Sequence, residues 1–324
     1  MTHARMLAVC MSGQPRIFQE YAREYRNTLA AVSASLSTSL FLSIHKDGEI
    51  DGRLQQQVEL LKPARHEYWT ARAPCSPPSN CIQLGNASVG MRGMRCSFYW
   101  QFTSVKRAYN LMLGFEQQHG TREASVTGHG SHRVRFAYVL RLRTDTLCPI
   151  AQLQRLFSDT ALFGSAVDPF TDEIFRGMTR NGHGPDVTST RFSDMAWLST
   201  RIVAESVMTV IDEFDGGCGA LLDPSVLQSR CPEPISFMYY ECILLARMLA
   251  KHPNVRLLPM LPDRWVCLKL CGEGICVDRD PERASISSSM PDHGTPSSSG
   301  TNRTTRTIRL PSSTLSNIVV RARD

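Results

Sequence analysis

Short apolar runs alternate with amphipathic stretches over the first part of the chain. Residues 6–12 form an apolar run typical of a buried strand, and a Gly-Gln-Pro-Arg sequence at 13–16 indicates its end. Apolar positions then repeat at i+4 spacing over 17–35, which predicts a helix. A second buried strand is predicted at 39–45 and a further helix at 51–62. This β-α-β order predicts parallel strands whose carboxyl ends lie at one edge of a sheet.

The same alternation continues toward residue 260. A long segment at 63–95, rich in Pro, Gly and Arg, is typical of a loop, and a strongly amphipathic helix is predicted over 96–120. The remaining expected elements are strands at 136–140, 161–167 and 255–260, helices at 151–158, 201–214 and 238–252, a polar linker at 121–132 and a Gly-rich loop at 177–190.

This order of elements predicts the fold class and the domain organisation. Strands that alternate with helices predict an α/β protein with a mostly parallel central sheet flanked by helices. A hydrophobic content of 42% with 20% charged residues is typical of a globular protein. Residues 281–324 contain sixteen Ser or Thr and show little periodicity. We therefore expect one domain over 1–280 and a disordered tail over 281–324.

The net charge of +6 is divided evenly between the tail and the rest of the chain. The tail holds six Arg, no Lys and three acidic residues, which gives +3, and the other residues carry the remaining +3. A nucleic-acid surface needs a dense basic stripe, so we expect no nucleic-acid partner. A mildly basic balance suits a site that receives anionic phosphates.

The sequence allows more than one interpretation of the protein's cellular location and of the redox state of its cysteines. No stretch approaches the ~20 apolar residues of a membrane span, and the first residues lack the apolar core of a signal peptide. We expect a cytoplasmic protein without a transmembrane segment, or a Golgi or ER lumen location if an anchor precedes this sequence. The eleven Cys are an odd number, so they cannot all pair within the chain. Reduced structural thiols, one or two disulfides in a luminal setting and a metal site all remain open.

The segment FAYVLRLRTDTLCPI at 136–150 carries the most informative polar residues. Side chains two apart on a strand share a face, so we expect Arg141, Arg143 and Asp145 on one side. Charges at the end of a buried strand are costly unless they pair or bind a ligand. In open α/β sheets, ligands bind outside these strand ends. Asp145 would then hold a divalent metal or a sugar hydroxyl while Arg143 neutralises phosphate; the alternative is an internal Arg–Asp salt bridge.

The sequence RLRTDT resembles the R-x-R-x-D element of a glycosyltransferase-like family that includes the WavE-type lipopolysaccharide-synthesis proteins and related plant and algal domains. Four other segments resemble elements of that family in the expected order: LAVCMSGQPRIF, CSFYWQFTSVKRAYNLMLGFE, RFSDMAWLST and YYECILLARML. The resemblance covers 6–265 and implies a GT-A-type, Rossmann-like fold. It implies transfer of a sugar from a nucleotide-sugar donor to an acceptor hydroxyl on a glycan, lipid or protein, with Mn²⁺ or Mg²⁺ as cofactor. Many GT-A enzymes carry Asp-x-Asp where this chain has Arg143-Thr144-Asp145.

The resemblance also implies which residues bind the donor. Gly13 and Arg16 follow the first strand, where Gly allows close backbone approach and Arg can pair with phosphate; the alternative is a tight turn with a surface Arg. His45 ends the second strand and would line the same edge, although a lone His there is more often structural. Gln101 lies near the start of the long helix, whose N-terminus attracts phosphate. Arg143 and Asp145 complete the implied donor site, with Asp145 as the metal ligand.

Two carboxylates are the candidates for catalysis. Asp194 is the candidate for an acceptor contact or for the base that deprotonates the acceptor hydroxyl, which an inverting transfer requires; the alternative is a helix or strand cap. Glu241 would orient an arginine or contact the sugar, whereas an isolated acid on a helix is more often solvated. Besides transfer, two function classes stay open: a GT-A-like domain that binds sugar or nucleotide without turnover, and an unrelated α/β hydrolase or phosphotransferase. The sequence contains neither the GxSxG motif nor the GxxxxGK[ST] motif, which argues against the hydrolase or phosphotransferase.

Overall fold

The computed structural model of the chain describes residues 6–15, 18–34, 36–46, 48–70, 91–127, 135–148, 150–179, 192–212, 240–260, 268–271 and 274–276. The chain divides into two compact units, Met1–Cys267 and Leu268–Asp324. Within the second unit, β9 (Leu268–Cys271) and β10 (Gly274–Cys276) pair antiparallel. The tail expected over 281–324 lies outside the described residues, so its disorder and the boundary at 280 stay predictions.

A seven-stranded sheet forms the centre of the first unit. Its strands are β1 (Met6–Gly13), β2 (Ser37–His45), β3 (Arg65–Trp69), β4 (Tyr138–Arg143), β6 (Ile174–Thr179), β7 (Phe192–Thr200) and β8 (Arg256–Met260). They lie in the order β3-β2-β1-β4-β7-β6-β8, and only β7 pairs antiparallel with its two neighbours. The predicted α/β class with a mostly parallel sheet is therefore confirmed.

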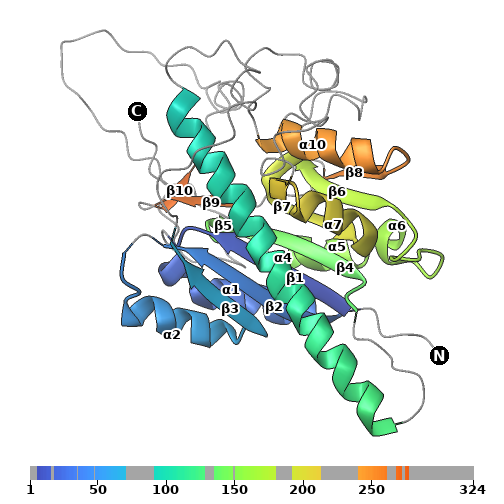
Figure 1. The fold of residues 1–324 in the computed structure, drawn as a ribbon, viewed down its shortest axis with the longest axis horizontal. Helices are drawn as coiled ribbons and strands as arrows, with labels where there is room; N and C mark the ends of the chain where they lie inside the picture. The colour runs from blue at the N-terminus through green and yellow to red at the C-terminus, as the bar shows by residue number, and fades with distance from the viewer. Residues whose placement is uncertain are drawn as a thin grey trace, which may run out of the picture. The chain divides into compact units, whose positions relative to one another are not determined.

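Helices cover both faces of this sheet (Figure 1). The helices are α1 (Phe18–Ser33), α2 (Gly52–Leu61), α4 (Met91–Thr127), α5 (Ile150–Phe157), α6 (Thr160–Phe163), α7 (Arg201–Met208) and α10 (Tyr240–Lys251). One face packs against α4, α7 and α10, whose apolar side chains form a single core cluster with residues of β1, β2, β4, β6 and β7. The other face packs against α1 and α5, and α2 lies beside α1.

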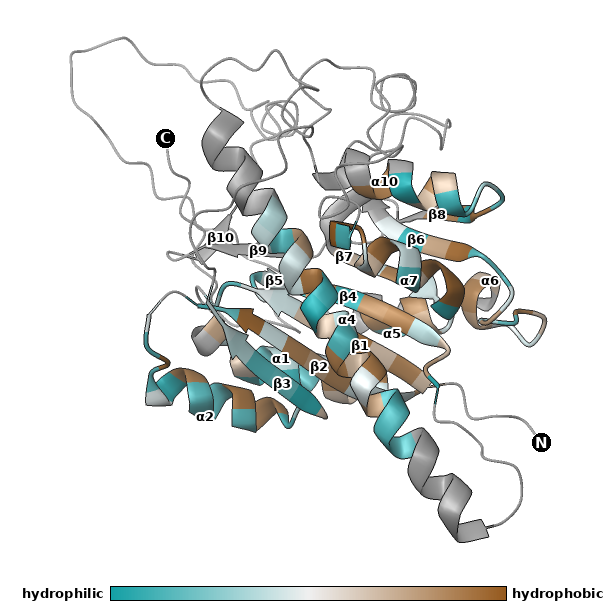
Figure 2. Ribbon diagram, viewed as in Figure 1, coloured by the Kyte–Doolittle hydropathy of each residue, from teal (hydrophilic) through white to brown (hydrophobic). Residues whose placement is uncertain are grey.

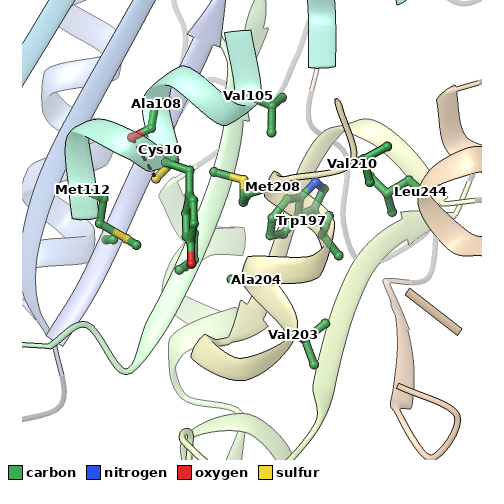
Figure 3. Close-up of a cluster of buried hydrophobic side chains, with 14 of the residues drawn as sticks. Cys10, Val105, Ala108, Met112, Trp197, Val203, Ala204, Met208, Val210 and Leu244 are labelled. Atoms are coloured by element: carbon green, nitrogen blue, oxygen red, sulfur yellow. Dashed lines mark hydrogen bonds between the residues drawn. The ribbon is translucent and has the colours of Figure 1, made fainter. Parts of the chain in front are cut away.

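The core on the α4 side consists of buried apolar residues around β1 and β7. Figure 3 shows Cys10 of β1 directed toward Ala108 of α4, and the Cys10 thiol donates to the Ala108 carbonyl at 4.0 Å. Burial raises the pKa of the Cys10 thiol to about 12, so this free cysteine stays a neutral packing residue. Trp197 of β7 is fully buried in the same cluster. Figure 2 shows hydrophobic colour along the central strands and hydrophilic colour on edge strand β3.

A buried polar network joins α4 to the start of α7. Arg201 follows β7 directly and donates to Glu116 Oε2 at 3.1 Å and to the hydroxyl of Tyr109. Glu116 Oε1 also accepts from the backbone N–H of Phe136 at 2.9 Å. The Arg201 and Glu116 side chains are only 6% and 11% exposed. Because both charges are removed from water, each depends on the other for compensation.

A second polar tie fixes the carboxyl end of α10. His252, the residue after the helix, contacts Glu173 Oε1 through Nδ1 at 2.8 Å and the Ser206 hydroxyl through Nε2 at 2.9 Å. Glu173 precedes β6 and Ser206 belongs to α7, so one imidazole connects three segments that are distant in sequence. The chain then turns into β8, which runs parallel to β6.

Several expected elements differ from the structure. The strand expected at 161–167 is wrong, because Asp159 caps the helix α6 there by accepting from the N–H of Ala161 at 2.8 Å. The loop expected at 63–95 is wrong in part, since it contains β3 and the start of α4. The linker expected at 121–132 is likewise helical as far as Thr127. The loop expected at 177–190 begins inside β6, and 180–190 lies outside the described residues.

Candidate functional site

A row of polar residues crosses four parallel strands near their carboxyl ends. The strand register places Glu67 beside Ser43, Ser43 beside Ser12, and Ser12 beside Arg143. All four lie on the face that α4 covers, because Cys10, two residues before Ser12, belongs to the core beneath that helix. The apolar core therefore ends at a polar band along this edge, which is where ligands bind in open α/β sheets.

The band ends at β4 in a bidentate ion pair. Arg143 donates from Nε to Asp145 Oδ1 and from Nη2 to Asp145 Oδ2, both at 2.8 Å. The Asp145 side chain is 4% exposed, whereas that of Arg143 is 18% exposed. Strand β4 ends at Arg143, so Asp145 lies in a turn and not on the strand as the alternation predicted. Its carboxylate nevertheless reaches back to the guanidinium, and both of its oxygens are engaged.

Arg141 occupies a different environment from Arg143. It pairs across the sheet with Cys10 on one side and Trp197 on the other, and it is 1% exposed. Its Nη2 donates to the Ser12 carbonyl at 3.4 Å. Arg141 therefore lies inside the core beneath the site, where it contributes positive charge without reaching the surface.

The turn before Asp145 is clamped against the loop that follows β1. Thr144 donates from its N–H to the Ser12 carbonyl at 3.2 Å and from its hydroxyl to the Gln14 carbonyl at 2.5 Å. Between these two contacts, Gly13 has a φ of +140°, and a Cβ there would lie 2.7 Å from Thr144 Oγ1. Only glycine fits this position, because other residues are strained at that φ and would meet Thr144. The glycine is required here by the packing of Thr144, and the approach of a donor to Gly13 stays a prediction.

Gly13→Ala is expected to lower the free energy of unfolding by about 2–3 kcal/mol, because backbone strain and the clash with Thr144 act together. For a unit of this size the thermal midpoint should fall by roughly 5–10 °C. Gly52→Ala is the matched control, since nothing lies within 4 Å of a Cβ there and Gly52 opens α2. Calorimetry should show a lower thermal midpoint for Gly13→Ala than for Gly52→Ala. Equal midpoints would contradict the close packing of Gly13 against Thr144.

Tyr25 of α1 holds the same turn from the opposite face of the sheet. Its hydroxyl donates to the Thr144 carbonyl at 2.9 Å, and its ring stacks on Phe18 with centroids 5.6 Å apart. Burial raises the pKa of Tyr25 well above its ordinary value, and the negative charge of Asp145 raises it further. The phenol therefore stays a neutral donor. Tyr25 lies within the helix predicted over 17–35, and the sequence offers no signal for this contact.

At the other end of the band, an aromatic and ionic cluster joins β2 and β3 to α4. Arg107 of α4 donates to both oxygens of Glu67, at 2.8 and 2.7 Å, and its guanidinium lies 5.3 Å from the centre of the Trp69 ring. Ser43 donates to Glu67 Oε1 at 2.9 Å. The predicted residue His45 is buried and stacks on Trp69 with ring centroids 4.4 Å apart. Sequence reasoning missed this cluster because it did not predict β3.

The other predicted site residues are placed less completely. Gln101 is partly buried on α4, beside Trp100, whose ring centroid lies 6.0 Å from that of His45. Arg16 lies outside the described residues. For Asp194 and Glu241 only the backbone is described, in β7 and in the first turn of α10.

The backbone positions of those two carboxylate residues can be related to the site. Ala196 of β7 pairs with Leu142 of β4, and the two strands are antiparallel. Asp194, two residues before Ala196, therefore lies at the edge where β4 ends. Helix α10 leads through a short turn into β8, so its first turn, with Glu241, lies toward the carboxyl ends of the parallel strands. The fold thus brings both backbones to the same edge as Gly13 and Arg143.

The residues described at this edge are a poor match for a divalent cation site. A cation prefers several oxygen ligands, and Asp-x-Asp supplies two carboxylates. Here both oxygens of Asp145 accept from Arg143, a positive charge that would repel a metal ion. Within the described residues, no group of three or more His, Cys, Asp or Glu could hold a metal ion. The donor set found at Asp145 therefore does not fit the expected metal.

The chain has a distant likeness to a protein of known structure. No protein-family model and no curated protein matches the chain. Among solved structures, a glycosyltransferase involved in the glycosylation of the major capsid of PBCV-1 covers 80% of this chain, over 82% of its own, at 8% identity and a TM-score of 0.30. At that level the likeness assigns no residue and no activity. No helix of the described part is both long and apolar enough to cross a membrane.

Proposed function

We propose that the chain is a glycosyltransferase whose nucleotide-sugar donor lies at the carboxyl ends of β1, β2 and β4. The observation that carries this proposal is the joint placement of Gly13 and the Arg143–Asp145 pair, which are held together through Thr144. Gly13 lets the turn at Thr144 lie against the end of β1, which places Arg143 at this edge. A guanidinium held by a carboxylate presents a fixed, planar phosphate ligand.

The roles follow from the charges that develop during transfer. The bond between the sugar C1 and the diphosphate oxygen breaks, and the departing diphosphate gains negative charge that Arg143 neutralises. The acceptor hydroxyl forms the new bond to C1 and loses its proton to a carboxylate, for which Asp194 is the proposed base. Glu241 is proposed to contact the sugar or the acceptor. His45 and Gln101 are proposed to border the nucleotide on the β2 side of the edge.

The two other function classes make different demands on the chain. A binding domain without turnover would need the donor contacts but neither Asp194 nor Glu241. One observation favours a serine hydrolase: Ser206, His252 and Glu173 are hydrogen-bonded in the order of a catalytic triad. However, Ser206 lies within α7, where the neighbouring backbone N–H groups bond within the helix and cannot stabilise an oxyanion. We therefore assign His252 the structural role of joining α10 to β6 and α7.

Donor binding can be tested by thermal unfolding with UDP-, GDP-, ADP- and CDP-sugars. A donor at 100-fold over its dissociation constant should stabilise the protein by roughly 2.7 kcal/mol. The shift should shrink in Asp145→Asn, which loses the charge that orients Arg143. It should persist in Asp159→Asn, where another carboxylate paired with an arginine, Arg176, is neutralised. If none of these donors shifts the midpoint, the proposed function is wrong.

A further inference from the structure

We propose that Arg143 replaces a divalent cation at the donor diphosphate, so that the nucleotide part of the donor binds without metal. This inference rests on the proposed function and names the group that neutralises the leaving diphosphate. It starts from the disagreement between the expected metal at Asp145 and the residues that surround that carboxylate.

Access to the pair favours an anion over a cation. The Asp145 side chain is 4% exposed and that of Arg143 is 18% exposed, so a ligand from solvent meets the guanidinium before the carboxylate. A metal ion would have to displace Arg143 from both oxygens of Asp145 and then remain next to its positive charge. A phosphate requires neither step, because it is attracted by the same guanidinium.

The charge balance at the end of β4 points the same way. Arg141 and Arg143 contribute two positive charges and Asp145 one negative charge, so these three residues sum to +1. Arg141 is buried, where a charge is weakly screened, and it lies two residues before Arg143 on the same face of β4. The end of β4 therefore offers a diphosphate a net positive charge from these three residues without added metal.

The geometry of the turn fixes where that charge lies. Asp145 holds the guanidinium through two parallel hydrogen bonds, and Thr144 is held in turn by Ser12, Gln14 and Tyr25. Arg143 is thereby oriented before any ligand arrives, which reduces the entropy lost on binding. Asp145 acts as a positioning residue for Arg143 in this arrangement and not as a metal ligand.

The test is calorimetric titration of the chain with UDP, GDP, ADP and CDP, in EDTA and again in Mn²⁺. At least one nucleoside diphosphate should bind, and its dissociation constant should agree within about twofold between the two conditions. Binding that needs Mn²⁺, with affinity at least tenfold weaker in EDTA, would overturn the inference while leaving the proposed function intact. If no nucleoside diphosphate binds in either condition, the proposed function fails as well.

Two variants extend this test at the same position. Arg143→Asp provides two carboxylates two residues apart, so binding should be lost in EDTA and partly restored by Mn²⁺. Arg143→Lys keeps the charge but loses the planar fork, so its binding should weaken about tenfold yet stay independent of EDTA. Arg143→Lys that becomes Mn²⁺-dependent would overturn the inference. Should Arg143→Asp fail to fold, the wild type and Arg143→Lys decide the question on their own.

Discussion

Glu116→Ala is expected to lower the free energy of unfolding by about 3–5 kcal/mol, the largest stability effect that we predict for a single substitution. Its carboxylate accepts from Arg201 at 3.1 Å and from the N–H of Phe136 at 2.9 Å. Removing it leaves a buried guanidinium with only the Tyr109 hydroxyl among these partners. That hydroxyl cannot offset the charge by ionising, because burial raises the pKa of Tyr109 to about 12.

Equilibrium unfolding in urea measures this effect. Glu116→Gln should lose less than Glu116→Ala, since an amide oxygen can still accept one hydrogen bond. Glu205→Ala is the control, because Glu205 is exposed on α7 next to the same network and should change stability by less than about 0.5 kcal/mol. A loss below about 1 kcal/mol in Glu116→Ala would mean that Arg201 does not depend on Glu116.

Arg143→Ala is expected to weaken binding of the nucleoside diphosphate about 100-fold, which corresponds to roughly 2.7 kcal/mol. The variant removes the group proposed to pair with the diphosphate and leaves Asp145, a carboxylate that repels it. Both effects act in the same direction, so the loss should exceed that of Arg143→Lys. Titration calorimetry gives the two dissociation constants directly.

The matched control for this prediction is Arg176→Ala. Arg176 also pairs with a carboxylate, Asp159, and its side chain is 16% exposed, close to the 18% of Arg143. It lies on β6, next to Phe175 of the α4-side core, so its side chain belongs to the opposite face of the sheet. Arg176→Ala should bind the nucleotide as the wild type does. If the wild type, Arg143→Ala and Arg176→Ala bind the nucleotide with equal affinity, Arg143 is not part of the donor site.

Much of the fold could be predicted because the first two strands are rich in apolar residues. Strand β1 and the second part of β2 are buried, so each shows a short, mainly apolar run, with a helix between them. Strand β3 was not predicted, because it is a half-exposed edge strand of polar and aromatic residues, RHEYW, without an apolar run. The segment ALFGSAV has the apolar run of a strand, but Asp159 caps a short helix there, and a run of that length does not separate the two.

The candidate site could be predicted in position but not in contacts. Alternation along β4 placed Arg141 and Arg143 on one face, whereas nothing in the sequence showed that Arg141 is buried and Arg143 partly exposed. The reach of Asp145 back to Arg143 depends on the turn that Thr144 and Tyr25 hold, which are contacts between segments more than a hundred residues apart. Such long-range contacts leave no periodic pattern in the sequence.

Amide hydrogen exchange with and without a saturating nucleoside diphosphate would test the position of the donor site most directly. We predict that exchange slows at residues 12–14 and 144–146, the two segments joined through Gly13 and Thr144. The same ligand should leave α7 and the segment around His252 unchanged. Slowed exchange confined to other segments, with 12–14 and 144–146 unaffected, would contradict the assignment of the donor to the carboxyl ends of β1 and β4.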